Sequence, residues 1–283
     1  MTLQEILNLN TTKAAKARML FEIGKTVKEV GDLICGGNYG WSYNIHKAWK
    51  EKLNGSATFD PRFGIEIEAY NIPRVTLSGA LREAGLSNWT VKSDGSLHGI
   101  NAFELVSPVL SGVEGMEQVK RVCEVLERLN GRVDRSCGLH VHLEARTFTI
   151  DTWKRVYKNY LRLESAIDSI MPRSRRGNTN QYCRSIGNES NIRRIDTATT
   201  VAELVERVGD GTRYCKVNGR AFAAHGTIEF RQHSGTVEYR KISNWVKFLK
   251  ALVSVSMQRE VNDFNFLSDE IKSYINERKE ELA

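Results

Sequence analysis

The clearest pattern along the chain is a strict alternation of apolar and polar residues in four short segments. These segments are FGIEIEAY (63–70), AFELVS (102–107), GLHVHLE (138–144) and TIEFRQH (227–233). A period of two is typical of β-strands, in which alternate side chains share a face. One face of each predicted strand is apolar. The other carries mostly ionisable groups, namely Glu66, Glu68, Glu104, His140, His142, Glu144, Glu229, Arg231 and His233.

Apolar residues at helical spacing lie between and around these strands. They predict helices from Ser111 to Gly131, from Asp151 to just before Pro172, from Thr200, from about Tyr239 to Met257, and from Ser268 onward. Residues 1–60 are also predicted to be mostly helical, with one pattern through Ala14–Leu33 and a short basic helix near Asn44–Leu53. The mixture indicates an α+β fold with helices covering one sheet face. We expect an N-terminal helical extension (1–60), a central domain (61–260) and a helical tail (261–283).

The composition favours a globular protein. The chain has 283 residues, of which 41% are hydrophobic and 27% charged, so wholesale disorder and fibrous classes are excluded. The longest apolar stretch, around Ala251–Met257, is far too short to span a membrane, and no secretory signal is recognisable. The five cysteines are scattered and form no CxxC pair, which fits a reducing cytoplasm better than a disulfide scaffold.

The net charge of +7 and the pI near 9.1 indicate an anionic partner. The basic residues are densest in one arginine-rich segment, which contains Arg173, Arg175, Arg176, Arg184, Arg193 and Arg194 with Glu189 as its only acid. A nucleic-acid surface, a pocket for phosphates and an ordinary solvated loop are all consistent with this segment.

The polar faces of the predicted strands suggest a metal site. Carboxylates crowded on one sheet face repel one another and need cations when they are ionised. Oxygen-rich clusters suit Mg²⁺ or Mn²⁺, and one or two imidazoles are compatible with either ion. Two such ions could bridge nucleotide phosphates, while Arg231 neutralises a transferred phosphoryl group. For any one strand, the alternative interpretation is an ordinary solvent-facing side of an antiparallel sheet.

Five motifs in order carry a family resemblance. FGIEIE (63–68), DGSL (94–97), ELVSP (104–108), CGLHVH (137–142) and GTIEFR (226–231) resemble the amidoligase family, which is similar to glutamine synthetase and glutamate–cysteine ligase. The resemblance covers roughly residues 63–257, the central domain. It implies a curved, partly closed antiparallel sheet with helices on its outer face, and ATP with Mg²⁺ or Mn²⁺ on the concave face.

The resemblance also implies roles for individual residues. It makes Glu66, Glu68, Glu104, His140 and Glu229 metal ligands, and Arg231, Asp94 and Glu229 catalytic residues. In this scheme Arg231 contacts the transferred phosphate and Asp94 helps to receive an amine. It further implies nucleotide contacts by His142, Arg231, Lys216, Asn218, Arg176 and Arg184.

The implied reaction joins a carboxylate to an amine through an acyl phosphate, on an amino-acid, peptide or protein substrate. The arginine-rich segment and the aromatic segment Tyr39–Tyr43 are candidate lids that would keep water out. Three alternatives stay open: a phosphotransferase of the same fold, a cupin-like metal protein built on His140 and His142, and a non-enzymatic protein that binds nucleic acid through the arginine-rich segment. No membrane partner is expected.

Overall fold

The computed structural model describes residues 2–53, 60–187 and 189–283, and the chain forms two compact units. The first unit spans Met1–Phe59 and the second spans Asp60–Ala283. The tail that follows residue 260 therefore belongs to the second unit, where its last helix packs on the preceding one. Among the helices of the described residues, none combines the length and the apolar character needed to cross a membrane.

The first unit is helical and contains α1 (Leu3–Asn8), α2 (Lys13–Glu22), α3 (Val27–Cys35) and α4 (Tyr39–Leu53). The single helical pattern expected over residues 14–33 is in fact two helices. Gly24 has a φ of +85° between them, and the Thr26 side chain accepts a hydrogen bond from the Glu29 amide to begin α3. The helix expected from residue 44 begins five residues earlier, at Tyr39.

The second unit is built on one antiparallel sheet of six strands. The strands are β1 (Phe63–Ala69), β2 (Thr90–Lys92), β3 (Phe103–Val106), β4 (Gly138–Glu144), β5 (Val217–Asn218) and β6 (Thr227–Ser234). Their order across the sheet is β2-β3-β1-β4-β6-β5, so the four strands recognised from alternation are neighbours. The sheet is not closed, because the short strands β2 and β5 form its two edges and do not pair with each other.

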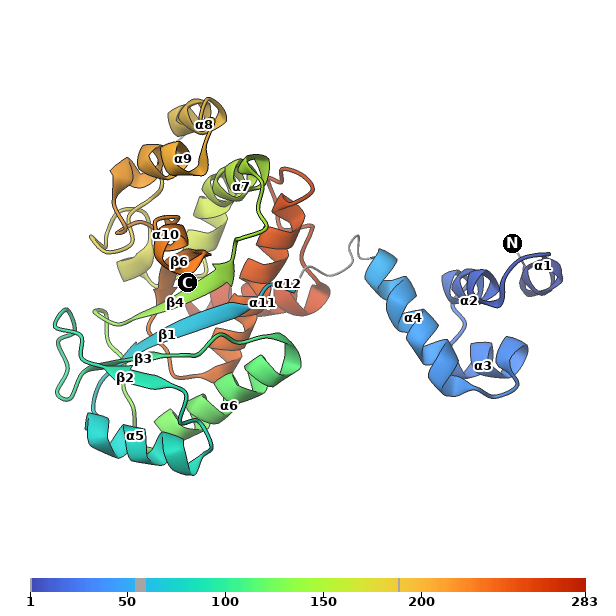
Figure 1. Ribbon diagram of the computed structural model, residues 1–283, viewed down its shortest axis with the longest axis horizontal. Coiled ribbons are helices and arrows are strands. Elements are labelled where there is room, and N and C mark those ends of the chain that lie inside the picture. Colours follow the sequence, from blue (N-terminus) through green and yellow to red (C-terminus); the bar gives the residue numbers. More distant parts are fainter. Residues whose placement is uncertain (1, 54–59, 188) are drawn as a thin grey trace. The chain divides into compact units, whose positions relative to one another are not determined.

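Helices surround this sheet in an α+β arrangement, as predicted (Figure 1). They are α5 (Arg74–Glu83), α6 (Gly112–Arg128), α7 (Ile150–Asp168), α8 (Glu189–Asp196), α9 (Val201–Arg207), α10 (Ala221–His225), α11 (Tyr239–Ser256) and α12 (Asp269–Glu281). The Thr200 and Ser268 side chains cap α9 and α12, which confirms the predicted starts of these two helices. Ser111 precedes α6, but its side chain makes no capping hydrogen bond.

The apolar faces of the strands are buried under the long helices. Ile65, Ile67, Leu139 and Val141 are at most 1% exposed, and α11 contacts α6, α7 and β4. Burying one such side chain stabilises the fold by about 1.5–3 kcal/mol. This one-sided burial leaves the opposite, ionisable faces of the same strands pointing together away from the core.

One strand departs from simple alternation. Between Leu139 and Val141 of β4, the partners on β6 are His233 and Phe230, so β6 carries one extra residue. Such a bulge reverses the side-chain alternation that follows it. His233 was expected on the same face as Glu229 and Arg231. It is instead buried on the helix side, with its ring 5.4 Å from that of Trp245 in α11.

We expect His233 to make the fold less stable in acid. Burial lowers its pKa from 6.5 to about 4, despite a hydrogen bond to the Ser234 carbonyl that acts in the opposite direction. Between these values the unfolded chain binds a proton that the folded chain does not, so stability falls as the pH falls from 6.5 to 4. The loss attributable to this one group is about 3 kcal/mol.

Urea unfolding of the wild type and of His233→Gln, from pH 7 to pH 4, measures this effect. The stability difference between the two proteins should shift by that amount in favour of the variant as the pH falls. The exposed His98 is the matched control, and His98→Gln should follow the wild type at every pH. A difference between wild type and His233→Gln that stays constant with pH would contradict the prediction.

Candidate functional site

The ionisable side chains form a continuous row across the sheet because of the strand register. Glu68 of β1 lies opposite Glu104 of β3, and Glu66 of β1 lies opposite His140 of β4. On the other side of β4, His142 lies opposite Glu229 of β6. Residues at paired positions of an antiparallel sheet point to the same face with Cβ atoms about 5 Å apart. The register therefore brings acids and imidazoles from four strands together.

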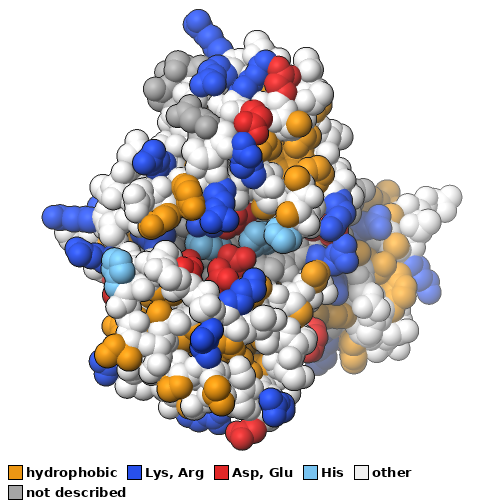
Figure 2. All heavy atoms as spheres, turned by 60° about the vertical axis from the view of Figure 1, so that its left-hand side comes forward, with side chains coloured by type: hydrophobic (Ala, Val, Ile, Leu, Met, Phe, Trp, Pro, Cys, Tyr) orange, Lys and Arg blue, Asp and Glu red, His pale blue; other side chains and the backbone are white. Residues whose placement is uncertain are grey.

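This row forms the floor of a hollow of about 500 Å³. Figure 2 shows acidic and histidine side chains gathered at the hollow, with lysine and arginine side chains around it. Its lining contains Glu66, Glu68, Asp94, Ser96, Glu104, Ser136, His140, His142, Arg175, Tyr182, Arg213, Tyr214, Asn218, Arg220, His225, Glu229 and Arg231. Most of the residues predicted from the sequence thus share one cavity.

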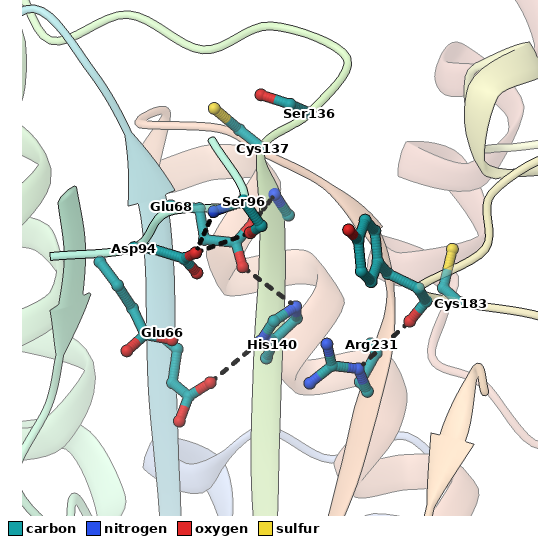
Figure 3. Close-up of polar contacts among 12 residues, drawn as sticks. Glu66, Glu68, Asp94, Ser96, Ser136, Cys137, His140, Cys183 and Arg231 are labelled. Atoms are coloured by element: carbon teal, nitrogen blue, oxygen red, sulfur yellow. Dashed lines mark hydrogen bonds and ion pairs between the residues drawn. The ribbon is translucent and has the colours of Figure 1, made fainter. Parts of the chain in front are cut away.

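His140 lies at the centre of the row and is 4% exposed. Its Nδ1 atom is 2.9 Å from Glu66 Oε2 and 3.6 Å from Glu229 Oε1, and its Nε2 atom is 3.6 Å from Glu68 Oε1. Figure 3 shows the side chains of Glu66 and Glu68 converging on this ring from β1. The second oxygen of Glu68 accepts a hydrogen bond from the Gly138 amide, which fixes the carboxylate.

The pKa values of the acids are pushed apart by this crowding. Burial raises the pKa of Glu66, but the hydrogen bond with His140 and charge attraction from His140 and His142 outweigh it, so the net pKa is well below the ordinary value. Burial and repulsion from Glu66 raise the pKa of Glu104 to about 7, although Lys92 lies 3.9 Å away. Crowded carboxylates whose pKa values are driven apart are typical of sites that bind cations.

Glu229 and Arg231 form the other end of the row. Glu229 is 5% exposed and accepts hydrogen bonds from Asn218 Nδ2 at 2.6 Å and from Arg231 at 2.5 Å. Burial raises the pKa of Glu229, but attraction by Arg231, His140 and His142 lowers it further, so the net shift is downward. Asn218 and Arg231, both predicted contacts, therefore face the hollow from β5 and β6.

The donor set fits divalent ions. Three overlapping groups each place ligand atoms within 4.8 Å of one another: Glu66, Glu104 and His140; Glu66, His142 and Glu229; and Glu68, Asp94 and Glu104. In addition, Nε2 of His142 is buried without a hydrogen-bond partner among the described residues, 3.5 Å from Glu66 Oε1. An orphaned imidazole nitrogen beside two carboxylates is the arrangement that a metal ion would complete.

Two turns with the same geometry line the rim beside this cluster. Asp94 Oδ1 accepts hydrogen bonds of 2.7 Å from both the amide and the hydroxyl of Ser96 (Figure 3). Asp134 holds Ser136 in the same way. These bonds fix both serines at the hollow. The carboxylate of Asp94 also lies next to those of Glu68 and Glu104, and three neighbouring carboxylates can bind a cation together.

The opposite wall is basic and aromatic, and the sequence analysis missed most of it. Tyr182 and Tyr214 form a ring pair with centroids 5.4 Å apart, and the Arg213 guanidinium lies 5.1 Å from the Tyr214 centroid. The adjacent basic and aromatic residues at 213–214 were the only sequence signal for this wall. Arg220 and His225 also line the hollow, but nothing in their sequence context distinguishes them.

Three residues predicted to contact a nucleotide lie outside the hollow. Lys216 is 0% exposed, and its Nζ atom lies 2.8 Å from Glu164 and 2.7 Å from Asp168 of α7, so it is a core residue. Arg176 donates to the Met171 carbonyl. Arg184 is exposed and lines a separate hollow of about 220 Å³. From this segment it is Arg175 that reaches the main hollow, where it donates to the Cys137 carbonyl at 2.5 Å.

A second hollow of about 580 Å³ shares Glu66, His142, Ala224 and His225 with the first. Its lining combines apolar side chains with three cations, and includes Phe63, Val106, Pro108, Val109, Arg62, Lys92 and Arg146. Arg62 and Arg146 both pair with Glu144, which holds them at the end of β4. The row of acids and imidazoles is therefore accessible from two differently lined cavities.

Comparison with known proteins gives one family match. Residues 81–253 match the family model described as "Putative amidoligase enzyme", and this range includes Glu104, His140 and Glu229 but begins after β1. No curated protein matches the sequence. Among solved structures, one titled "Crystal structure of novel glutamine synthase homolog" is similar over 79% of this chain, with 12% identity and a TM-score of 0.36. The similar region spans 62% of that protein.

Proposed function

The chain belongs to the family described as "Putative amidoligase enzyme", and from this premise we propose that it is an ATP-dependent ligase that joins a carboxylate to an amine. Family membership supports a ligase-type enzyme. The observation that carries the finer proposal is the row from Glu104 to Glu229, which offers oxygen and imidazole ligands beside Arg231 in one cavity. Such a row is suited to a reaction in which negative phosphate oxygens must approach one another.

The row would hold the divalent ions that accompany ATP. Glu66, Glu104 and His140 would bind one ion, and Glu66, His142 and Glu229 another. Bound there, Mg²⁺ or Mn²⁺ would screen the charge of the triphosphate. Arg231, already paired with Glu229, is placed to stabilise charge on the phosphoryl group that is transferred.

The proposed reaction has two steps. An oxygen of the substrate carboxylate attacks the γ-phosphorus of ATP, the bond to the bridging oxygen breaks, and ADP leaves. The amine, which binds as its ammonium form, first gives one proton to a neighbouring carboxylate. Its nitrogen then attacks the acyl carbon, inorganic phosphate leaves, and the nitrogen gives a second proton to solvent to form the amide. Asp94 with Glu68 and Glu104 would attract the ammonium form of the amine to this cavity.

The two hollows suggest how the substrates divide the site. The wall with Tyr182, Tyr214 and Arg213 offers ring faces and positive charge, which suit a purine base and its phosphates. The second hollow, with Arg62 and Arg146 beside apolar side chains, suits a carboxylate substrate that has an apolar portion. Both reach Glu66 and His142, where the reacting groups would meet.

Tyr214→Ala is expected to raise KM for ATP about 10-fold while kcat changes little, because stacking on a base contributes about 1–3 kcal/mol. Tyr214→Phe keeps the ring and is the matched control, which should retain a KM near that of the wild type. Steady-state kinetics with varied ATP measure both. Equal KM values for Tyr214→Ala and wild type would show that the adenine base of ATP does not stack on Tyr214.

The function itself is tested with the full chain, ATP, and Mg²⁺ or Mn²⁺ against panels of amino acids and peptides. Mass spectrometry should find a product that equals the two substrates less one water, formed together with ADP and phosphate. A phosphorylated product without an amide would favour the phosphotransferase alternative. If equilibrium dialysis with metal finds no binding of ATP at all, both enzyme proposals fail.

A further inference from the structure

The first unit has a hydrophobic core of its own, separate from the ligase site. Ile6, Ala17, Leu20, Phe21 and Val30 are buried at its centre. Side chains from the other helices pack around them, including Leu3, Met19, Val27, Ile34, Trp41, Ile45 and Trp49. The proposed ligase chemistry uses none of these residues, so we looked to the surface of this unit for a separate function.

Helices α3 and α4 of this unit form a helix–turn–helix (Figure 1). The turn is Gly36, Gly37 and Asn38, and both glycines have positive φ values, +58° and +87°, which other residues rarely adopt. Asn38 Oδ1 accepts a hydrogen bond of 3.0 Å from the Trp41 amide and so begins α4. A short turn that contains glycine between two helices is a feature of this motif.

The two helices cross closely because small residues face each other. A Cβ atom on Gly31 of α3 would lie 2.7 Å from a ring carbon of Tyr39 and 3.2 Å from Ser42 Oγ. Ser42, 0% exposed, donates a hydrogen bond of 2.7 Å to the Val27 carbonyl at the start of α3. These contacts fix the orientation of α4 on α3. A helix that is held in this way can be presented rigidly to a partner.

Over residues 39–49, the outward face of α4 carries Asn44, Lys47 and two exposed tyrosines, and none of its own side chains there is acidic; Tyr39 donates a hydrogen bond to Asp32 of α3. Trp41, Ser42, Ile45 and Trp49 point into the unit, and the exposed positions are Tyr39, Gly40, Tyr43, Asn44, Lys47 and Ala48. These positions recur at intervals of about four residues, so they form one stripe along the helix. The sequence from residue 39 to residue 50 contains no Asp or Glu.

The first unit carries a net positive charge, which would attract a polyanion. Residues 1–53 contain eight Lys and Arg but only five Asp and Glu. Lys13, Arg18, Lys28 and Lys47 are exposed, and none forms an ion pair with a residue that the structure describes. Exposed cations of this kind bind phosphates and release counterions.

We propose that the first unit binds duplex DNA, with α4 as the recognition helix in the major groove. An α-helix fits this groove, where an amide such as Asn44 reads adenine and a cation such as Lys47 reads guanine or contacts a phosphate. The small residues Gly40 and Ala48 allow the helix to approach closely. Duplex DNA, and not the free nucleotide of the ligase site, is therefore the ligand expected for this surface.

Selection from a random-sequence duplex pool with the full chain tests the proposal. An enriched sequence should emerge, and its binding should weaken with salt. Asn44→Ala/Lys47→Ala should lower the affinity for that sequence at least ~10-fold. Both residues are exposed, so helix content and thermal unfolding should match the wild type. The control, Arg193→Ala/Arg194→Ala, removes two exposed cations of the second unit and should bind as the wild type does.

Failure to enrich any sequence would overturn the proposal, as would equal binding by the Asn44→Ala/Lys47→Ala variant. Loss of binding only in Arg193→Ala/Arg194→Ala would assign DNA binding to the arginine-rich segment instead. The outcome does not depend on the ligase reaction, because the assay contains neither ATP nor an amine.

Discussion

Replacing Glu229 by glutamine is expected to lower the rate of ATP-dependent ligation about 1000-fold, equivalent to about 4 kcal/mol of transition-state stabilisation. Glutamine has the same shape but carries no charge. The substitution removes the anionic oxygen that faces His140, His142 and Arg231, and with it one ligand of a proposed metal site. Initial rates with saturating ATP, together with Mn²⁺ binding measured by calorimetry, should both show the loss.

A second variant separates metal binding from the support of Arg231. Glu66 has no arginine partner among the described residues, and it belongs to two of the three ligand groups. Glu66→Gln should therefore lose activity and Mn²⁺ affinity as severely as Glu229→Gln. Glu117→Gln, the same change on the exposed side of α6, is the control and should remain active. Normal turnover by Glu66→Gln or Glu229→Gln would remove that residue from the set of metal ligands.

Lys216→Met is expected to destabilise the fold by about 3–5 kcal/mol, the largest stability effect foreseen for a single substitution in this protein. The ammonium group is wholly buried between Glu164 and Asp168, and Asp168 also accepts a hydrogen bond from Gln232. Without the lysine, the buried Glu164 and the partly buried Asp168 remain with no cation between them. Urea unfolding of the two proteins at pH 7 measures the difference.

Two further variants identify the cause of this loss. Lys216→Met combined with Glu164→Gln and Asp168→Asn removes the uncompensated charge and should recover most of the stability. Lys247 forms an exposed pair with Glu270, so Lys247→Met should cost less than about 1 kcal/mol. If Lys216→Met were as stable as the wild type and instead raised KM for ATP, the lysine would be a nucleotide contact after all.

The strands and their polar faces were predictable because alternation is a local property of the backbone. Glu66 and Glu68 share a face whatever β1 pairs with, and the same holds for His140 and His142 on β4. The prediction for β6 was correct up to Arg231 and wrong at His233. The bulge arises from the pairing of β6 with β4, and the sequence of β6 contains no pattern that predicts it.

The surroundings of the residues proposed to contact a nucleotide were harder to predict, because they depend on distant parts of the chain. Lys216 is neutralised by residues 52 and 48 positions away, which only the packing of α7 against the sheet brings near. The wall of Tyr182 and Tyr214 likewise joins two loops that are separate in sequence. Basic composition alone could not distinguish Arg175, which reaches the hollow, from its neighbour Arg176.

The sequence by itself determined the α+β class, the four central strands and the identity of the acids and imidazoles that face away from the core. Those features follow from side-chain periodicity and the burial of apolar groups. The tertiary structure decided the strand order, the register that sets Glu66 against His140 and Glu68 against Glu104, and the fate of Lys216. Pairing between distant segments is fixed by the packing of the whole unit, and periodicity within one segment carries no information about it.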